Sequence, residues 1–400
     1  MTLTEETLRF VAEHRHDDVR TLALQAARYP HVDMPVALTQ IAGRQAAEEK
    51  IPTWAATDGI LYPPHLSMEQ CSSEVTARYK ATIVEAFGGR HEQFADLTGG
   101  FGIDCSFLSA LFSHATYVER QEVLCEAARH NFPLLGLEHI NVCHADGTDY
   151  LRDMTGTDWL FLDPARRDGH GGKTVAIADC EPDVAALEPL LLEKAGHVLI
   201  KLSPMLDLTQ ALHTLRHVSE AHIVSVGNEC KELLLILTRG DMTEPDRVPI
   251  RCINLPTDQA AFSFTRQEEQ DTACPYAPTL RTYLYEPNAS LLKAGAFRSL
   301  ANAYKAEKLH PNSHLYTSDM PLPDFPGRMF RIDGWCGFGK KEVKSLLGEN
   351  RKANITVRNF PATVAELRKR LKLAEGGNIY LFATTLAEGQ KVLVRCSKPN

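Results

Sequence analysis

The chain has 400 residues and a mass of 44.5 kDa, with 44% hydrophobic and 24% charged residues, so it is long enough for two to four globular domains. It contains no apolar run near the roughly 18 residues of a membrane helix, no signal-like N-terminus, and no C-x-x-C or H-E-x-x-H spacing. These features exclude a membrane span, a disulfide framework and a recognisable metal site, and they predict a cytoplasmic protein.

Residues 1–90 are predicted to form a helical N-terminal domain. Ser67 and Gln70 have the spacing of a capping box, which predicts one continuous helix over 68–87. The region carries no pattern whose chemistry goes beyond helix formation, so the sequence leaves its role open.

Residues 91–240 alternate short β-rich runs with apolar helical segments. This alternation predicts an α/β fold with a mostly parallel, doubly wound sheet. Only "GNECKE" separates the last two runs, which is too short for a crossover helix, so the final strand should be antiparallel to its neighbour. The predicted strands are 94–97, 115–118, 140–143, 159–162, 198–202, 223–226 and 233–237.

The remaining residues are predicted to form two small α+β domains, 241–326 and 327–400, with prolines at both boundaries. Thr363 and Glu366 form a capping box for a helix in the last domain. That domain has 15 Lys and Arg against six Asp and Glu, a net charge of +9, whereas the rest of the chain carries −17. A basic module on an acidic body indicates a polyanionic partner, although a charged solvated face has the same composition.

The stretch "ADLTGGFGID" follows the first predicted strand and contains Asp96 with Gly99, Gly100 and Gly102. Glycines at the carboxyl end of such a strand let the backbone turn tightly and let a ligand approach closely. Two ligand classes suit this loop: a dinucleotide, and S-adenosylmethionine, which has a sulfonium and an amino-acid end but no phosphate. A tight β-to-α turn without any ligand would also use these glycines.

Asp96 favours S-adenosylmethionine over a dinucleotide. A carboxylate directly before the glycines would repel a pyrophosphate and attract the ammonium group of a methionine moiety. The spacing also departs from the G-x-G-x-x-G pattern of dinucleotide folds. An NAD-dependent oxidoreductase is therefore the less favoured interpretation.

Two further acidic residues follow the second and third predicted strands. Glu119 lies 23 residues after Asp96, where a carboxylate can accept both ribose hydroxyls of the cofactor. Asp146 could accept a hydrogen bond from the adenine amine, although "ADG" is also a common turn sequence.

Together these residues resemble the class I S-adenosylmethionine-dependent methyltransferases. The chain is most similar to a group in Bacteroidetes-type bacteria that is regarded as RNA methyltransferases and has a THUMP-like C-terminal domain. The resemblance implies a Rossmann-like sheet over 91–240, a ferredoxin-like domain over 241–326 and a basic RNA-binding domain over 327–400. The segments that carry it are "LSMEQCSSEVTARYK", "DLTGGFGID", "LDPARRD", "KLSPMLD", "NECKELL", "YLYEPNASLLKAGAF" and "ANITVRNFPATVAELRKRLKL".

The segment "LDPARRD" resembles the Asp/Asn-Pro-Pro-aromatic motif of enzymes that methylate exocyclic amines. This resemblance implies that Asp163 and the carbonyl of Pro164 accept hydrogen bonds from the target amine. Arg166 stands where the family has an aromatic residue, and with Arg167 it suits stacking on a base or holding a phosphate, unless both are ordinary surface arginines.

Uracil C5 methyltransferases have a similar stretch and a Cys nucleophile after the fifth strand. Here Ser203 occupies that region, which disfavours a covalent Cys intermediate. Lys201 and Ser203 line the pocket or merely pack at a strand end; both interpretations stay open.

We therefore expect a methyltransferase that modifies a base of a structured RNA, with an exocyclic amine favoured. Methyltransferases of DNA or protein, and a non-catalytic RNA-binding protein of the same fold, are the alternatives; a protein-docking or self-packing role would also explain the basic domain. The residues predicted to bind RNA are Arg351, Lys352, Arg358, Arg368, Lys369, Arg370 and Lys372, joined by Lys340, Lys341 and Lys344.

Overall fold

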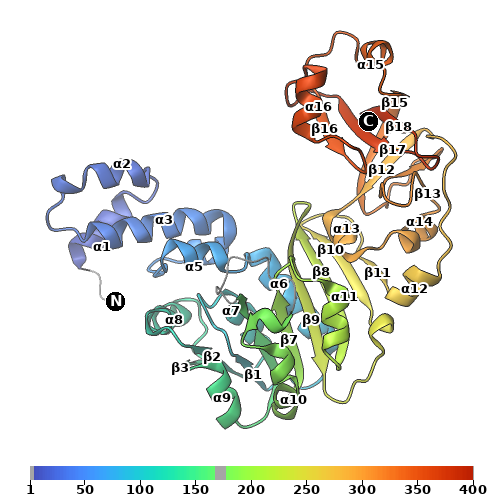
Figure 1. The fold of residues 1–400 in the computed structure, drawn as a ribbon. Helices are drawn as coiled ribbons and strands as arrows, with labels where there is room; N and C mark the ends of the chain where they lie inside the picture. The colour runs from blue at the N-terminus through green and yellow to red at the C-terminus, as the bar shows by residue number, and fades with distance from the viewer. Residues whose placement is uncertain (1–3, 167–176, 400) are drawn as a thin grey trace. The chain divides into compact units, whose positions relative to one another are not determined.

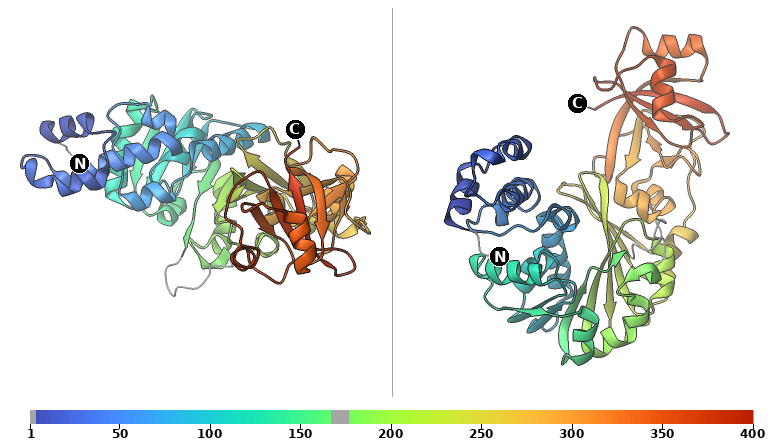
Figure 2. Two further views of the ribbon diagram at one scale, coloured as in Figure 1. Left: turned by 90° about the horizontal axis from the view of Figure 1, so that it is seen from above. Right: turned by 60° about the vertical axis from the view of Figure 1, so that its left-hand side comes forward.

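A computed structural model describes residues 4–166 and 177–399. The chain forms two compact units, which are Met1–Ser219 with Leu234–Met242, and Glu220–Leu233 with Thr243–Asn400. The boundary between the units passes through two strands of the larger sheet. The ribbon is drawn in three views in Figures 1 and 2.

The N-terminal region is helical, as predicted, and its helices begin at polar capping residues. Side chains of Thr4, Asp18, Asp33 and Ser73 each accept a hydrogen bond from a first-turn N–H. The elements are α1 (Glu5–Glu13), α2 (Val19–Leu24), η1 (Ala26–Arg28), α3 (Met34–Lys50), α4 (Pro52–Ala55), α5 (His65–Gln70) and α6 (Glu74–Phe87).

The prediction of one continuous helix over 68–87 is wrong. Helix α5 ends at Gln70, and α6 begins only at Glu74. Ser73 ends the break, because its hydroxyl caps α6 by accepting the N–H of Thr76. The break leaves Ser72 in a non-helical position, where its side chain is buried.

The larger sheet has nine strands in the order β11-β10-β8-β9-β7-β4-β1-β2-β3. The pairs β7/β4, β4/β1, β1/β2 and β2/β3 are all parallel, which confirms the mostly parallel prediction. Its strands are β1 (Gln93–Asp96), β2 (His114–Glu119), β3 (Ile140–His144), β4 (Thr157–Leu162), β7 (Ala195–Leu202), β8 (Val218–Val226), β9 (Glu229–Thr238), β10 (Ile250–Leu255) and β11 (Phe262–Phe264).

Helices connect the parallel strands and pack on the sheet (Figure 1). The apolar runs of the strands are almost fully buried, as in β4 and β7, which fits a sheet covered on both faces. These helices are α7 (Ile103–Ser109), α8 (Glu122–Leu134), α9 (Gly147–Asp153), α10 (Val184–Lys194) and α11 (Leu208–Thr214). The short elements β5 (Ala165–Arg166), η2 (Ile177–Asp179) and β6 (Cys180–Glu181) lie between β4 and α10.

Strands β8 and β9 form a two-residue hairpin, so the predicted antiparallel final strand is confirmed. Gly227 and Asn228 connect them and have φ values of +56° and +66°. Positive φ at both central positions is the conformation that two-residue hairpins favour. The N–H of Thr238 donates to the carbonyl of His217, which continues the antiparallel register.

The sheet continues past residue 240, where we expected the sheet domain to end. After η3 (Pro245–Arg247), β10 pairs in parallel with β8, and β11 pairs antiparallel with β10. Ile250 and Cys252 alternate with an exposed Arg251, so this strand buries one face. Prolines before β10 therefore mark a loop between two strands of one sheet.

The second sheet has seven strands in the order β13-β14-β12-β15-β18-β17-β16, in the orange and red part of Figure 2. The predicted capping box of Thr363 and Glu366 is present at α16. The strands are β12 (Tyr283–Pro287), β13 (Glu307–Lys308), β14 (Tyr316–Ser318), β15 (Gly327–Cys336), β16 (Asn354–Val357), β17 (Tyr380–Thr385) and β18 (Lys391–Ser397). The helices after β11 are α12 (Arg266–Asp271), α13 (Ala289–Ala294), α14 (Arg298–Tyr304), α15 (Lys340–Leu347) and α16 (Val364–Leu371).

Candidate functional site

The glycine turn joins β1 to α7 at the carboxyl edge of the sheet. Gly100 and Gly102 have φ values of +53° and +90°, which side chains with a Cβ rarely adopt. A Cβ on Gly99 would lie 2.3 Å from the ring of Tyr117. Packing or backbone conformation therefore favours glycine at all three positions, in addition to any use in ligand approach.

Asp96 ends β1 and is 1% exposed. Its Oδ1 accepts the N–H of Thr98 at 2.9 Å, whereas its Oδ2 has no hydrogen-bond partner among the described residues. Burial raises the pKa of Asp96 well above the ordinary aspartate range, and the nearby carboxylates of Asp104 and Asp163 raise it further. A buried acceptor without a donor is costly, so this oxygen suits a cationic or hydrogen-donating ligand group.

Glu119 ends β2, and its two carboxylate oxygens contact the glycine turn and the start of α8. Its Oε2 accepts the N–H of Gly100 at 2.9 Å, and its Oε1 accepts the N–H of Gln121 at 2.8 Å. Each oxygen keeps further acceptor capacity, which a ligand hydroxyl could use.

Asp146 is the N-cap of α9. Its Oδ1 accepts the N–H groups of Thr148 and Asp149 at 2.8 and 3.2 Å. The turn that "ADG" suggested is therefore present. Asp146 forms this turn and also lines the cavity described next.

A cavity of about 230 Å³ opens at the carboxyl ends of β1, β2 and β4. It brings together Glu119, Asp146 and Asp163, which the sequence placed after three different strands. Asp96 and the three glycines do not line it, but Leu97 and Thr98 of the same turn do. With Glu181 also in its wall, the cavity is predominantly acidic and suits a ligand with positive charge.

Asp163, which follows β4, is fixed through its backbone and its side chain. Its N–H donates to Oγ1 of Thr98 at 2.7 Å, and its carboxylate Oδ2 contacts Nζ of Lys201 at the end of β7. Loss of hydration raises the pKa of Asp163, and the charge of Lys201 opposes that rise. Its side chain remains 37% exposed and faces the cavity.

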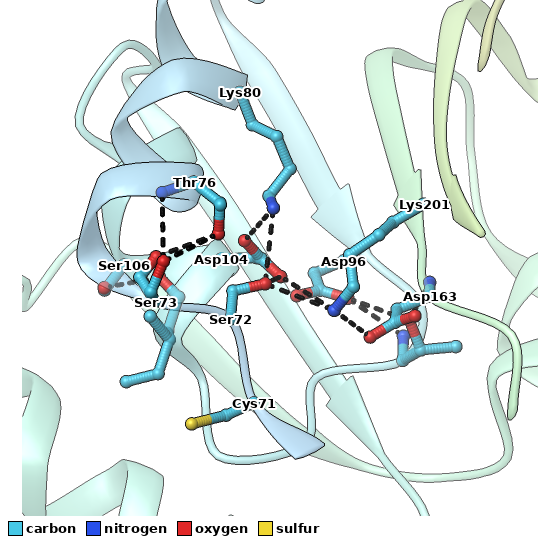
Figure 3. A network of polar contacts seen from close by, with 12 residues as sticks. Cys71, Ser72, Ser73, Thr76, Lys80, Asp96, Asp104, Ser106, Asp163 and Lys201 are labelled. Carbon is cyan, nitrogen blue, oxygen red and sulfur yellow. Dashed lines mark hydrogen bonds and ion pairs between the residues drawn. The ribbon is translucent and has the colours of Figure 1, made fainter. Parts of the chain in front are cut away.

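A buried network of charges continues behind Asp163 (Figure 3). We call it the Lys201 network; its members are Ser72, Lys80, Asp104, Asp163 and Lys201. Nζ of Lys201 lies 3.7 Å from Asp104 and 3.2 Å from Oγ of Ser72. Nζ of the fully buried Lys80 lies 3.1 Å from the other oxygen of Asp104.

The two lysines determine the charge state of Asp104. Burial alone would raise its pKa, but the charges of Lys80 and Lys201 and the hydroxyl of Ser72 hold that pKa below the ordinary value. Asp104 is therefore an ionised group that anchors both ammonium groups beneath the cavity.

The sequence showed no chemistry in the N-terminal region and so missed Ser72 and Lys80, which both belong to the Lys201 network. One signal was present in the sequence: Lys80 lies on the same face of α6 as the buried Ala77 and Val84. A lysine at a core position of an amphipathic helix requires a buried partner. The identity of that partner could not be read from the sequence.

The other residues predicted at the reacting end are placed as follows. Pro164 is buried, and Arg166 pairs through its backbone with Cys180 in the β5/β6 ladder. Arg167 lies outside the described residues. Ser203 accepts the N–H of Met205 at 3.3 Å in the loop after β7.

The predicted RNA-binding residues fall into two groups. Arg358 is ion-paired with the buried Glu286 at 2.7 Å, and Arg368 contacts Glu375 at 3.5 Å. The others are exposed and have no ion pair to a described carboxylate: Arg351, Lys352, Lys369, Arg370 and Lys372.

Two features are absent from residues 4–166 and 177–399. No group of three or more His, Cys, Asp or Glu side chains there has an arrangement that could hold a metal ion. No helix of this part is long and apolar enough to cross a membrane.

Comparisons with known proteins give two domain matches and one full-length relative. A ferredoxin-like domain family matches residues 283–326, and a THUMP domain-like family matches residues 327–398. A proposed methyltransferase from Porphyromonas gingivalis W83 is 37% identical, with a TM-score of 0.88 and coverage of 100% of both chains. A search of curated proteins found no match.

Two more distant structures resemble only part of the chain. M. capricolum TrmK, in complex with S-adenosyl-homocysteine, is 10% identical, with a TM-score of 0.31 over 42% of this chain and 70% of its own. An rRNA methylase from Streptococcus thermophilus is 14% identical, with a TM-score of 0.31 over 40% of this chain and 94% of its own. At such low scores neither structure indicates what this chain binds.

Proposed function

The chain belongs to the class I S-adenosylmethionine-dependent methyltransferases with a THUMP-like C-terminal domain, and from this premise we propose that it methylates a base of a structured RNA. One observation carries the proposal. The cavity at the carboxyl edge of the sheet is lined by Glu119, Asp146 and Asp163 together, so a methyl donor and an acceptor group could meet there.

The acidic residues at and next to the cavity support binding of the cofactor there. Asp96 lies directly before the cavity-lining Leu97, and its Oδ2 has no hydrogen-bond partner among the described residues; it would accept the ammonium group of the methionine moiety directly or through water. Glu119 would accept the ribose hydroxyls, and Asp146 the adenine amine. Gly99, Gly100 and Gly102 would let the backbone lie close to the ligand. When bound, S-adenosylmethionine supplies the activated methyl group.

Asp163 and Pro164 would hold the target amine. One oxygen of Asp163 contacts Lys201, and Asp163 lines the cavity. The second oxygen of Asp163 and the carbonyl of Pro164 would accept the two amine hydrogens, which orients the nitrogen lone pair toward the methyl group. Asp163 would then take the proton that the methylated nitrogen releases, and its raised pKa suits that task.

Lys201 would act as a positioning residue for Asp163. It fixes one carboxylate oxygen, and it is itself held by Asp104 and Ser72. The geometry of the reacting carboxylate would therefore depend on residues from α6, α7 and two strand ends.

The thiols near the site support a reaction without a covalent Cys intermediate. Burial raises the pKa of Cys71, which precedes Ser72, and raises that of Cys105 still further. A thiol with a raised pKa is a poor nucleophile, because the thiolate is the reactive form.

RNA is the favoured substrate because of the C-terminal domain. Five of its predicted contact residues are exposed and unpaired within the described chain, which leaves their charges available to phosphates. Phosphate contacts would position the RNA, and the cavity would select the base.

Modified nucleosides in cells provide the test. Total RNA, DNA and protein from a deletion strain would be compared by mass spectrometry with strains that express the wild type, Asp163→Ala or Asp153→Ala. Asp153 is an exposed residue of α9 and serves as the matched control. We expect one methylated nucleoside to disappear from RNA in the deletion and Asp163→Ala strains only. A mark lost from DNA or protein, or RNA unchanged by Asp163→Ala, would contradict the proposal.

A further inference from the structure

A cavity of about 250 Å³ lies between α15 and α16 in the THUMP-like domain. We call it the α15–α16 pocket. Four cationic side chains line it, and none of its lining residues is acidic. These four are Lys340, Lys344, Arg351 and Arg370.

The charges of these four residues are not neutralised by described carboxylates. Other arginines of this domain have such partners: Arg358, Arg368 and Arg395 each lie within 4.0 Å of a Glu or Asp oxygen. The four pocket residues are exposed and make no ion pair in the described part of the chain. Positive charge is therefore concentrated at one concave place, which attracts an anion.

The pocket also has an apolar and aromatic wall. The guanidinium carbon of Arg370 lies 4.0 Å from the ring centroid of Phe338, and Val343 and Leu347 form buried parts of the lining. An isolated phosphate gains no binding free energy from such a wall. A nucleobase gains from it, because flat rings stack on aromatic rings and on guanidinium planes.

Cationic side chains beside an apolar wall are complementary to the phosphate and the base of a nucleotide. We propose that the α15–α16 pocket binds one unpaired nucleotide of the RNA, with its phosphate against Lys340, Lys344 and Arg351 and its base against Phe338 and Arg370. This inference rests on the proposed function in that RNA is the substrate. It makes the domain a reader of a single-stranded loop or end, since a paired base in a helix could not enter the pocket.

Two double variants of the full-length chain separate the pocket from general charge. Lys344→Ala/Arg370→Ala removes two pocket charges, one from α15 and one from α16. Arg331→Ala/Lys398→Ala removes two exposed charges from the same domain, at positions outside the pocket that were not predicted to bind RNA. The probes are adenosine 5′-monophosphate, inorganic phosphate, a single-stranded oligoribonucleotide and an acidic peptide, and binding is measured by calorimetry.

We expect the wild type to bind the mononucleotide more tightly than inorganic phosphate. The pocket variant should lose at least roughly tenfold in affinity for both the mononucleotide and the oligoribonucleotide. The control variant should bind the mononucleotide within about twofold of the wild type. Thermal unfolding checks that each variant is folded. If the pocket variant does not fold, Lys340→Ala/Lys344→Ala takes its place, because it leaves the Arg370–Phe338 contact intact. The same loss of affinity is expected for it.

Several outcomes would overturn the inference. These are equal affinity for phosphate and mononucleotide, equal losses in the two double variants, or a wild type that binds an acidic peptide as tightly as the oligoribonucleotide. Failure of the proposed function would look different, because the wild type itself would then neither bind S-adenosylmethionine nor methylate RNA. A chain that methylates RNA but shows one of the three outcomes above refutes the pocket alone.

Discussion

Nζ of Lys201 contacts the carboxylate of Asp163, which joins the ends of the adjacent parallel strands β7 and β4. The same ammonium group lies 3.7 Å from Asp104, so one lysine connects a half-buried carboxylate at the cavity with a buried one beneath it. This arrangement makes the position and charge of Asp163 dependent on residues that no ligand would touch.

The first prediction concerns Lys201→Met. Because Lys201 opposes the raised pKa of Asp163, its loss should raise that pKa further. The acidic limb of the pH profile of kcat/KM should then move to higher pH, and kcat should fall by roughly 10²-fold. Lys201→Arg keeps the positive charge, so the acidic limb of its pH profile should lie at the same pH as in the wild type. A Lys201→Met profile that superimposes on the wild type would refute a positioning role.

The second prediction concerns Asp96→Asn. The folded-state pKa of Asp96 is raised, so its ionisation opposes folding as the pH rises from about 4 through that pKa. The neutral amide should therefore stabilise the ligand-free protein at pH 7, by roughly 1–3 kcal/mol. The increase in Tm that S-adenosylmethionine produces in the wild type should shrink. Unchanged cofactor stabilisation, measured by thermal shift, would exclude Asp96 from binding.

The third prediction concerns Lys80→Met. Lys80 is completely buried against Asp104, and removing one member of a buried ion pair costs about 3–5 kcal/mol of unfolding free energy. Lys80→Met/Asp104→Asn should be less destabilised than the sum of the two single variants, as urea denaturation would show. Strict additivity would mean that the two side chains do not interact.

Acid stability tests the same pair independently. The folded-state pKa of Asp104 is lowered, so its contribution to stability is present above about pH 4 and is lost as the pH falls through the lowered pKa. In Lys80→Met this pH dependence should become smaller. An equally steep loss of stability in acid for both proteins would assign the effect to other carboxylates.

The fourth prediction separates Arg358 from the RNA-binding residues with which the sequence grouped it. Arg358 pairs with Glu286, which is 2% exposed, so Arg358→Ala should lower the unfolding free energy by roughly 1–3 kcal/mol. Lys369→Ala removes an exposed charge and should change stability by less than about 0.5 kcal/mol. Equal stability of the two variants would refute a structural role for Arg358.

Much of the fold was predictable because its signals are local. All seven expected strands of the large sheet are present, and the two-residue link between β8 and β9 determined the antiparallel strand. The strands extend beyond the apolar runs, as in β9, where "ECKE" continues the strand with polar residues. Backbone pairing, which needs no apolar side chain, determines those ends.

The site was predictable only where residues follow strand ends. Glu119, Asp146 and Asp163 meet at one cavity because the carboxyl ends of parallel strands share one sheet edge. Ser72 could not be placed in this way, since it contacts Lys201 across 129 residues of sequence from a break between two helices. Such long-range contacts depend on tertiary packing, which no local pattern encodes.

Transfer of an isotopically labelled methyl group is the most direct test of the central claim. Purified wild-type protein and Asp163→Asn would each be incubated with labelled S-adenosylmethionine and, separately, with cellular RNA, DNA and protein. The account predicts label in an RNA base, on an exocyclic nitrogen, with the wild type and at least roughly 10²-fold less with Asp163→Asn. Label in DNA or protein but not in RNA, or equal RNA labelling by both proteins, would contradict it.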